Sequence, residues 1–156
     1  SEVGNENELN DILDVIDEKF QPEIILDEKE LQSQLAVFLK AMYPDKKIER
    51  EERTKGGDWI DLLIDNNYVL ELKVPSSKTN LRSLSAQIEE YMEEFPLLAV
   101  VIADKSEIMT DEDDEEMYDP KFDKNLTKKI KEYADRYKVK YGIRTLIFPV
   151  KKRSKK

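Results

Sequence analysis

The 156-residue sequence contains neither cysteine nor histidine. The lack of cysteine excludes disulfides, thiolate zinc sites and cysteine nucleophiles, and it favours a reducing compartment such as the cytoplasm. The lack of histidine excludes Ser-His-Asp triads, HExxH zinc proteases and imidazole general bases. The groups left for catalysis are carboxylates, lysines and hydroxyls, together with the hard divalent cations that carboxylates bind.

Long apolar runs are missing as well. The longest, residues 96–103, is far shorter than the roughly 20 residues that a membrane-spanning helix needs, and no charged-then-apolar leader precedes it. We therefore expect a soluble, cytoplasmic protein with no membrane partner. The length suits one domain, 1–156. Within it we expect a helical extension at 1–26, a core at 27–104, an acidic loop at 105–119, a helix and strand at 120–150, and a basic tail at 151–156.

Charge is spread very unevenly along the chain. The net charge is −9, yet residues 121–156 carry fourteen Lys and Arg against three acidic residues, which leaves −20 for residues 1–120. A basic segment can contact phosphates on an acidic protein, because local potential governs contacts within a screening length of about 8–10 Å. A solvated helix followed by a frayed lysine tail explains this charge equally well.

Hydrophobic spacing predicts the secondary structure. Apolar residues recur at helical intervals over 6–20, 27–42, 79–95 and 120–137, and strand patterns occupy 46–54, 58–64, 68–74, 97–103 and 145–150. Asp27 is the expected N-cap of the second helix, with Glu30 placed as in a capping box. The first three strands predict an antiparallel meander. The wholly apolar strand at 97–103 is typical of an α/β sheet covered on both faces.

The hairpin at 58–74 can be tested by register, since a slip of one residue moves every side chain to the other face. A three-residue loop at 65–67, with Asn67 in the left-handed conformation, makes one face wholly apolar through the pairs Ile64–Tyr68, Leu62–Leu70 and Ile60–Leu72. A two-residue loop mixes polar and apolar side chains on both faces and fits less well.

The same register places Asp61 across from Glu71 and Trp59 across from Lys73. Two carboxylates directly opposite each other repel, so the pair needs a positive partner. Mg²⁺ or Mn²⁺ is such a partner, because these cations are held by one or two carboxylates with substrate phosphate completing the shell. Lys73 projects from the same face as Glu71, where it could stabilise negative charge on a reacting phosphate.

This arrangement, D61-x9-E71-x-K73 on a hairpin flanked by helices, resembles the PD-(D/E)XK nuclease superfamily. Gln87 and Tyr91, in A86-Q-I-E-E-Y91, resemble the Q-x3-Y element of its RecB-like branch. The resemblance covers residues 27–104 and implies a restriction-endonuclease-like αβββαβ core with a mixed central sheet between helices. The proline that gives the family its name is absent, since Ile60 precedes Asp61.

The resemblance also implies the roles of residues. Asp61 and Glu71 bind Mg²⁺ or Mn²⁺, Lys73 assists catalysis, and Gln87 and Tyr91 support the site. A glutamate on the preceding helix often joins the metal, for which Glu30 matches best and Glu28 is the fallback. The implied function is a metal-dependent nuclease that hydrolyses phosphodiester bonds, with DNA favoured, in repair, recombination or defence. Near the start of the third helix, Lys78 and Arg82 are candidates for phosphate contact.

Simpler explanations stay open for these residues. Glu71 and Lys73 could form an exposed cross-strand ion pair, and Glu30 could serve only as a cap. Lys78 and Arg82 could be ordinary solvated side chains. The runner-up function is a catalytically inactive PD-(D/E)XK-type module that binds nucleic acid or protein. A homodimer is compatible with a small nuclease that cuts two strands, and the acidic N-terminal helix is a candidate docking or dimerisation element.

Overall fold

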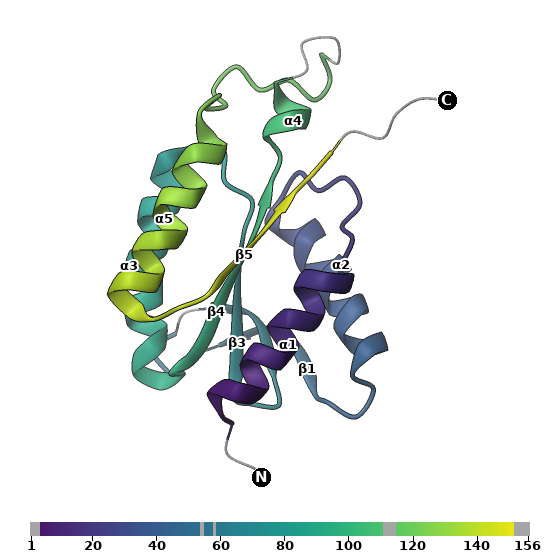
Figure 1. Cartoon of the computed structure of the whole chain (residues 1–156), viewed down its shortest axis with the longest axis vertical. Coiled ribbons are helices and arrows are strands. Elements are labelled where there is room, and N and C mark those ends of the chain that lie inside the picture. Colours follow the sequence, from purple (N-terminus) through teal and green to yellow (C-terminus); the bar gives the residue numbers. More distant parts are fainter. Residues whose placement is uncertain (1–3, 54, 58, 111–114, 152–156) are drawn as a thin grey trace.

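The computed structural model describes residues 4–53, 55–57, 59–110 and 115–151. Its elements follow the order that hydrophobic spacing predicts, with one short helix added after the fourth strand (Figure 1). They are α1 (Glu6–Lys19), α2 (Glu28–Met42), β1 (Ile48–Arg53), β2 (Trp59–Ile64), β3 (Tyr68–Lys73), α3 (Lys78–Glu94), β4 (Leu97–Asp104), α4 (Ser106–Met109), α5 (Leu126–Tyr141) and β5 (Thr145–Pro149).

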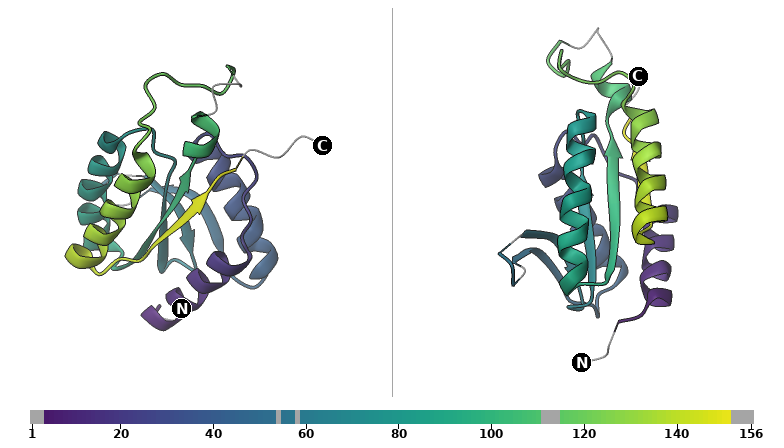
Figure 2. Two further views of the ribbon diagram at one scale, coloured as in Figure 1. Left: turned by 45° about the horizontal axis from the view of Figure 1, so that its top comes forward. Right: turned by 90° about the vertical axis from the view of Figure 1, so that its left-hand side faces the viewer.

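The five strands form one mixed sheet in the order β1-β2-β3-β4-β5. The predicted meander is confirmed, because β1, β2 and β3 pair antiparallel, whereas β3, β4 and β5 pair parallel. Helices α1 and α2 cover one face of the sheet and α3 and α5 cover the other, which gives three layers (Figure 2). The fold is α/β, with a five-stranded mixed sheet flanked by helices.

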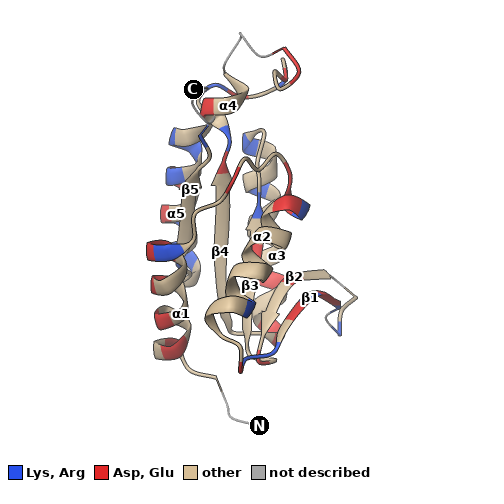
Figure 3. Cartoon of the chain, turned by 90° about the vertical axis from the view of Figure 1, so that its right-hand side faces the viewer, with Lys and Arg blue, Asp and Glu red and all other residues tan. Residues whose placement is uncertain are grey.

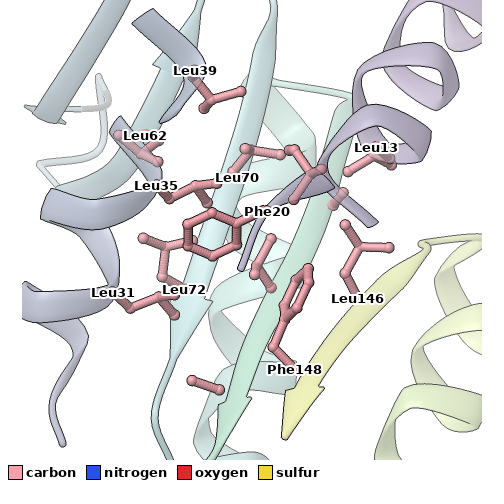
Figure 4. Close-up of a cluster of buried hydrophobic side chains, with 14 of the residues drawn as sticks. Leu13, Phe20, Leu31, Leu35, Leu39, Leu62, Leu70, Leu72, Leu146 and Phe148 are labelled. Carbon is pink, nitrogen blue, oxygen red and sulfur yellow. The ribbon is translucent and has the colours of Figure 1, made fainter. Parts of the chain in front are cut away.

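Each face of the sheet has its own hydrophobic core. On the α1 and α2 side, the buried stripes of both helices meet strand residues (Figure 4). This cluster includes Leu13, Phe20, Leu31, Leu35, Leu39, Leu62, Leu70, Leu72, Leu146 and Phe148. On the α3 and α5 side, a second cluster forms around Leu81, Leu84, Ile88, Val100, Ile102, Ile130 and Tyr137. The apolar run of β4 contributes to both clusters, as expected of a strand covered on both faces.

The last helix differs from its prediction at both ends. Spacing placed it at 120–137, but α5 begins at Leu126 and ends at Tyr141. Residues 119–125 form turns instead, because the side chains of Asp119 and Asp123 accept hydrogen bonds from the backbone two residues ahead. At the other end the helix continues until Gly142, whose φ of 70° ends it.

Next to its loop, the β2–β3 hairpin has the predicted register, and the loop has the predicted length. Ile64 pairs with Tyr68, Leu63 with Val69, and Leu62 with Leu70, around a loop at 65–67. The assignment of the left-handed residue was wrong, because Asp65 and Asn66 have φ of 52° and 58° and Asn67 does not. Two successive left-handed residues form a tight reversal that Asp and Asn tolerate through their short polar side chains.

The charge asymmetry is visible on the fold. In Figure 3 the ribbon of α1 is marked by acidic residues and that of α5 by basic ones. The centre of the acidic loop, 111–114, and the basic tail, 152–156, lie outside the described residues. In the part of the chain that the structure describes, no helix is both long enough and apolar enough to cross a bilayer.

Candidate functional site

Strands β2 and β3 separate beyond the pair Leu62–Leu70. The next expected pairs, Asp61–Glu71 and Ile60–Leu72, are not part of the ladder. The Leu72 N–H instead donates to the carboxylate of Asp61, with 2.9 Å between N and Oδ2. The Asp61 side chain therefore takes the place of a backbone acceptor, which lets the two strands part at this point.

Strand β2 also changes face at Asp61. Ile60 packs in the α3 and α5 core, whereas Leu62 packs in the α1 and α2 core, although strict alternation would put both on one face. The prediction that Ile60 joins the apolar face with Leu62 and Leu72 was therefore wrong. Across the pair of strands, Glu51 of β1 has a φ of 55°, so the irregularity extends into the neighbouring strand.

A hollow of about 380 Å³ lies where the strands separate. Most of the predicted site residues line it, together with residues from α2, the β1–β2 loop and the start of β2. The lining residues are Glu28, Gly57, Trp59, Asp61, Glu71, Leu72, Lys73, Gln87 and Tyr91. The structure thus brings Asp61, Glu71, Lys73, Gln87 and Tyr91 together around one opening.

Glu71 is the most unusual ionisable group in the hollow. It is only 4 % exposed, and burial raises the pKa of its carboxyl well above 4.5. The Asp61 carboxyl, with which it can share a proton, raises the pKa of Glu71 further, and the charge of Glu28 adds to this effect. Lys73 opposes the shift. Ionisation of Glu71 is therefore unfavourable in the hollow unless a cation lies beside its carboxylate.

Two oxygens in the hollow have no hydrogen-bond partner. They are Oε2 of Glu71 and Oε1 of Gln87, and both are buried. Buried polar atoms normally have hydrogen-bond partners, so two unpartnered oxygens that line one opening indicate that a partner is missing. Both atoms are acceptors, and that partner must therefore donate hydrogen bonds or carry positive charge.

Helix α3 supplies Gln87 and Tyr91 from one face, as their spacing predicts. The Tyr91 hydroxyl donates to the carbonyl of Trp59 at 2.8 Å, which ties the helix to the first residue of β2. The backbone N–H of Lys55 donates to Glu94 at 2.9 Å and joins the β1–β2 loop to the same helix. These two contacts fix the outer wall of the hollow.

The two glutamates at the start of α2 have different surroundings. Glu30 is exposed and accepts a hydrogen bond from the N–H of Leu26 at 2.8 Å, while its own N–H donates to the N-cap Asp27. Glu30 therefore serves as a cap and does not line the hollow. Glu28 lines the hollow and its charge acts on Glu71, so the fallback residue is the one beside the acidic pair.

Lys78 and Arg82 are not among the residues that line the hollow. Both are exposed and lie near Tyr133 of α5. Burial raises the pKa of Tyr133, but Arg82, Lys78 and Arg136 together outweigh burial and leave that pKa lowered. These cations therefore form part of a basic surface between α3 and α5, away from the acidic pair.

Gln32 supports the site through hydrogen bonds, and it was not identified as a site residue from the sequence. It is 3 % exposed, and its amide N–H donates to the backbone carbonyl of Asp61 at 3.0 Å. Its amide oxygen accepts from the guanidinium of Arg50 at 3.0 and 3.3 Å. Gln32 therefore anchors Asp61 at the point where β2 leaves the regular ladder. A glutamine inside an amphipathic helix gave no signal for this role.

We expect Gln32→Ala to lower the free energy of unfolding by about 1–3 kcal/mol, because it leaves the half-buried carbonyl of Asp61 without its hydrogen bond. Gln34→Ala is the matched control, since Gln34 is on the same helix and its amide oxygen accepts a hydrogen bond from the exposed N–H of Glu23. Urea unfolding of both variants measures the difference. Equal losses would contradict an anchoring role for Gln32.

The donor set of the hollow suits a hard divalent cation. Within the described ranges, no three acidic side chains gather closely enough to hold a metal ion by themselves. Mg²⁺ needs fewer, because it keeps several waters and is often held by one or two carboxylates with phosphate oxygens. Asp61, Glu71 and the orphaned Gln87 oxygen supply oxygen ligands of this kind. The residues present therefore fit Mg²⁺ or Mn²⁺.

Comparison of the chain with protein-family models, with curated proteins and with solved structures found no match.

Proposed function

We propose that this protein is a metal-dependent nuclease with a restriction-endonuclease-like core, in which Asp61 and Glu71 hold Mg²⁺ or Mn²⁺ and Lys73 assists hydrolysis of a phosphodiester. The observation that carries the proposal is the orphaned, buried Glu71 oxygen beside Asp61 in a hollow that also contains Lys73. DNA is the favoured substrate, as the resemblance implies. The αβββαβ order of α2 to β4 is consistent with the family's core.

The arrangement of the hollow argues against a purely structural role for these groups. A structural ion pair would leave both partners satisfied, whereas Glu71 keeps an unpaired oxygen next to a second carboxylate. Keeping this group costs stability, which proteins commonly accept at functional sites.

Each residue has a distinct task in the proposed reaction. A bound Mg²⁺ or Mn²⁺ would supply Lewis acidity toward a phosphate oxygen and toward water. The Lys73 ammonium, at the end of β3, stabilises the negative charge that develops on the phosphate. Tyr91 holds the backbone at Trp59, and the Gln87 amide orients groups beside Glu71. Glu28 adds negative charge at the same opening and strengthens cation binding.

Calorimetric titration with Mn²⁺ tests the proposed ligands. We expect Asp61→Asn to abolish binding and Glu28→Gln to weaken it by about ten-fold or more, as loss of a supporting carboxylate does. Glu30→Gln is the matched control, because it changes the same charge on the same helix turn outside the hollow. It should bind Mn²⁺ like the parent protein.

Two outcomes would contradict these assignments. If Mn²⁺ binds the parent and Asp61→Asn equally, the cation is held elsewhere. If the parent binds no Mn²⁺ at millimolar concentrations, the nuclease proposal fails, and the inactive binding module becomes the better account.

A further inference from the structure

Trp59 is an exposed aromatic side chain at the rim of the hollow. It is the single tryptophan of the chain, and 57 % of the residue is exposed. Few large apolar side chains among the described residues are as exposed as Trp59. Of these, Trp59 is the one that lines the opening with Asp61 and Glu71. An indole left in water beside a candidate active site indicates a binding role.

The backbone of Trp59 is fixed although its ring is exposed. The Trp59 carbonyl accepts from the Tyr91 hydroxyl at 2.8 Å, and the nearby β1–β2 loop is tied to Glu94 through the N–H of Lys55. Binding at the ring would therefore require little ordering of the chain. A preorganised aromatic surface loses less entropy on binding than a mobile one does.

Arg53 lies across the hairpin from Trp59 and places its guanidinium 5.1 Å from the ring centroid. This cation–π contact restricts the indole and puts a positive charge beside it. Proteins that bind single-stranded nucleic acids commonly combine aromatic rings, on which bases stack, with cationic side chains that contact the phosphates.

The rim that Trp59 shares with Gly57 is open at Gly57. Gly57 also lines the hollow, and no atom lies within 4 Å of the position that a Cβ would take there. A flat group can therefore reach the rim without displacing a side chain from this position. The open rim continues into the space around Asp61 and Glu71.

We propose that Trp59, held by Arg53, stacks a nucleobase of an unpaired strand, so that the adjoining phosphodiester lies at the Asp61–Glu71 hollow. This inference rests on the proposed function and names its substrate class, which is single-stranded nucleic acid. A base in a duplex has both faces covered by its neighbours and must be unstacked, at a cost, before it can lie on an indole. An unpaired base has a face available at once.

Because the chain has one tryptophan, its fluorescence reports contact at this position alone. We expect an oligodeoxythymidine of about 12 nucleotides, titrated in EDTA so that the strand stays intact, to quench the fluorescence of the parent protein. The matching duplex should quench it several-fold less at equal nucleotide concentration. Equal quenching by both, or no quenching by either, would overturn the inference.

Variants distinguish stacking on Trp59 from electrostatic attraction of the strand to the protein. Fluorescence anisotropy of a labelled single strand measures the affinity of each variant. Trp59→Ala should bind about ten-fold or more weakly, whereas Trp59→Tyr should stay within a few-fold of the parent. Tyr118→Ala is the matched control, because Tyr118 is an aromatic residue that is 39 % exposed and does not line the hollow. Unchanged binding in Trp59→Ala would overturn the stacking role.

The two proposals fail in different ways. Metal-dependent cleavage of duplex DNA without quenching would overturn the stacking inference and leave the nuclease proposal standing. Quenching by single strands without cleavage in any metal would support the stacking surface and remove the nuclease proposal.

Discussion

Lys73→Ala is expected to lower the rate of Mg²⁺-dependent phosphodiester cleavage by about a hundred-fold or more. Lys73 lines the same hollow as Asp61 and Glu71 at the end of β3. Removing a positive group aimed at developing charge in a reacting phosphate commonly costs rates of this order. Single-turnover cleavage of a labelled strand measures the loss directly.

Two controls make the Lys73 result specific. The variant should still bind Mn²⁺, since lysine is not a ligand and its removal takes away a repulsive charge. Lys78→Ala removes an exposed lysine that does not line the hollow, so it should cleave within a few-fold of the parent. A Lys73 variant that cleaves as fast as the parent would contradict the catalytic role.

Glu71→Gln is expected to stabilise the protein in EDTA at neutral pH. Glu71 is buried beside the Asp61 carboxyl, so its ionisation is costly in the folded protein, whereas a glutamine amide carries no charge and can donate to Asp61. The gain should be about 1–3 kcal/mol in the free energy of unfolding, the usual scale for an unsatisfied buried group. For a chain of this length, each kcal/mol raises Tm by about 2–4 °C.

The pH dependence of this gain follows from the direction of the shift. The pKa of Glu71 is raised in the folded protein above its unfolded value near 4.5, so the folded state binds the proton more tightly. Below about pH 4.5 both states are protonated, and the parent and the variant should be equally stable. The advantage of Glu71→Gln should grow as pH rises above about 4.5, where the unfolded state loses its proton, and should level off once pH has passed the raised folded pKa.

Saturating Mn²⁺ should reverse the order of stability. A cation that binds only the folded parent stabilises it in proportion to the logarithm of metal concentration, whereas Glu71→Gln has lost a ligand and should respond less. Thermal unfolding in EDTA and in Mn²⁺ gives both comparisons. A variant that is less stable than the parent in EDTA would show that the Glu71 carboxylate stabilises the fold.

The hairpin shows how far sequence patterns can define this site. Alternating apolar residues on both sides of 65–67 determine the register, because another loop length would expose leucines and bury polar side chains. That register brings Asp61 and Glu71 close together. Helical spacing in the same way places Gln87 and Tyr91 on one face of α3.

The break in β2 could not be predicted from alternation. Ile60 and Leu62 are two apart, a spacing that puts both on one face, yet they pack on opposite sides of the sheet. At this point the N–H of Leu72 donates to the Asp61 carboxylate, a contact between strands that local sequence patterns do not reveal. An aspartate inside an apolar strand was the one local hint.

The choice between Glu28 and Glu30 also depended on tertiary structure. Both glutamates follow Asp27 in the first turn of α2, where the helix dipole favours a negative charge at either, although only Glu30 stands at the capping-box position. The direction in which α2 meets the sheet puts Glu28 at the hollow and leaves Glu30 to cap the helix. Crossing geometry of this kind is set by packing between elements that are distant in sequence.

Cleavage of labelled single-stranded, duplex and four-way-junction DNA, with Mg²⁺, Mn²⁺ or EDTA, tests the account most directly when the parent protein is compared with Glu71→Ala and Lys73→Ala. The account predicts metal-dependent cutting by the parent, with single strands preferred, and loss of cutting in EDTA and in both variants. Cutting that survives both substitutions, or a folded parent that cuts nothing in either metal, would contradict it.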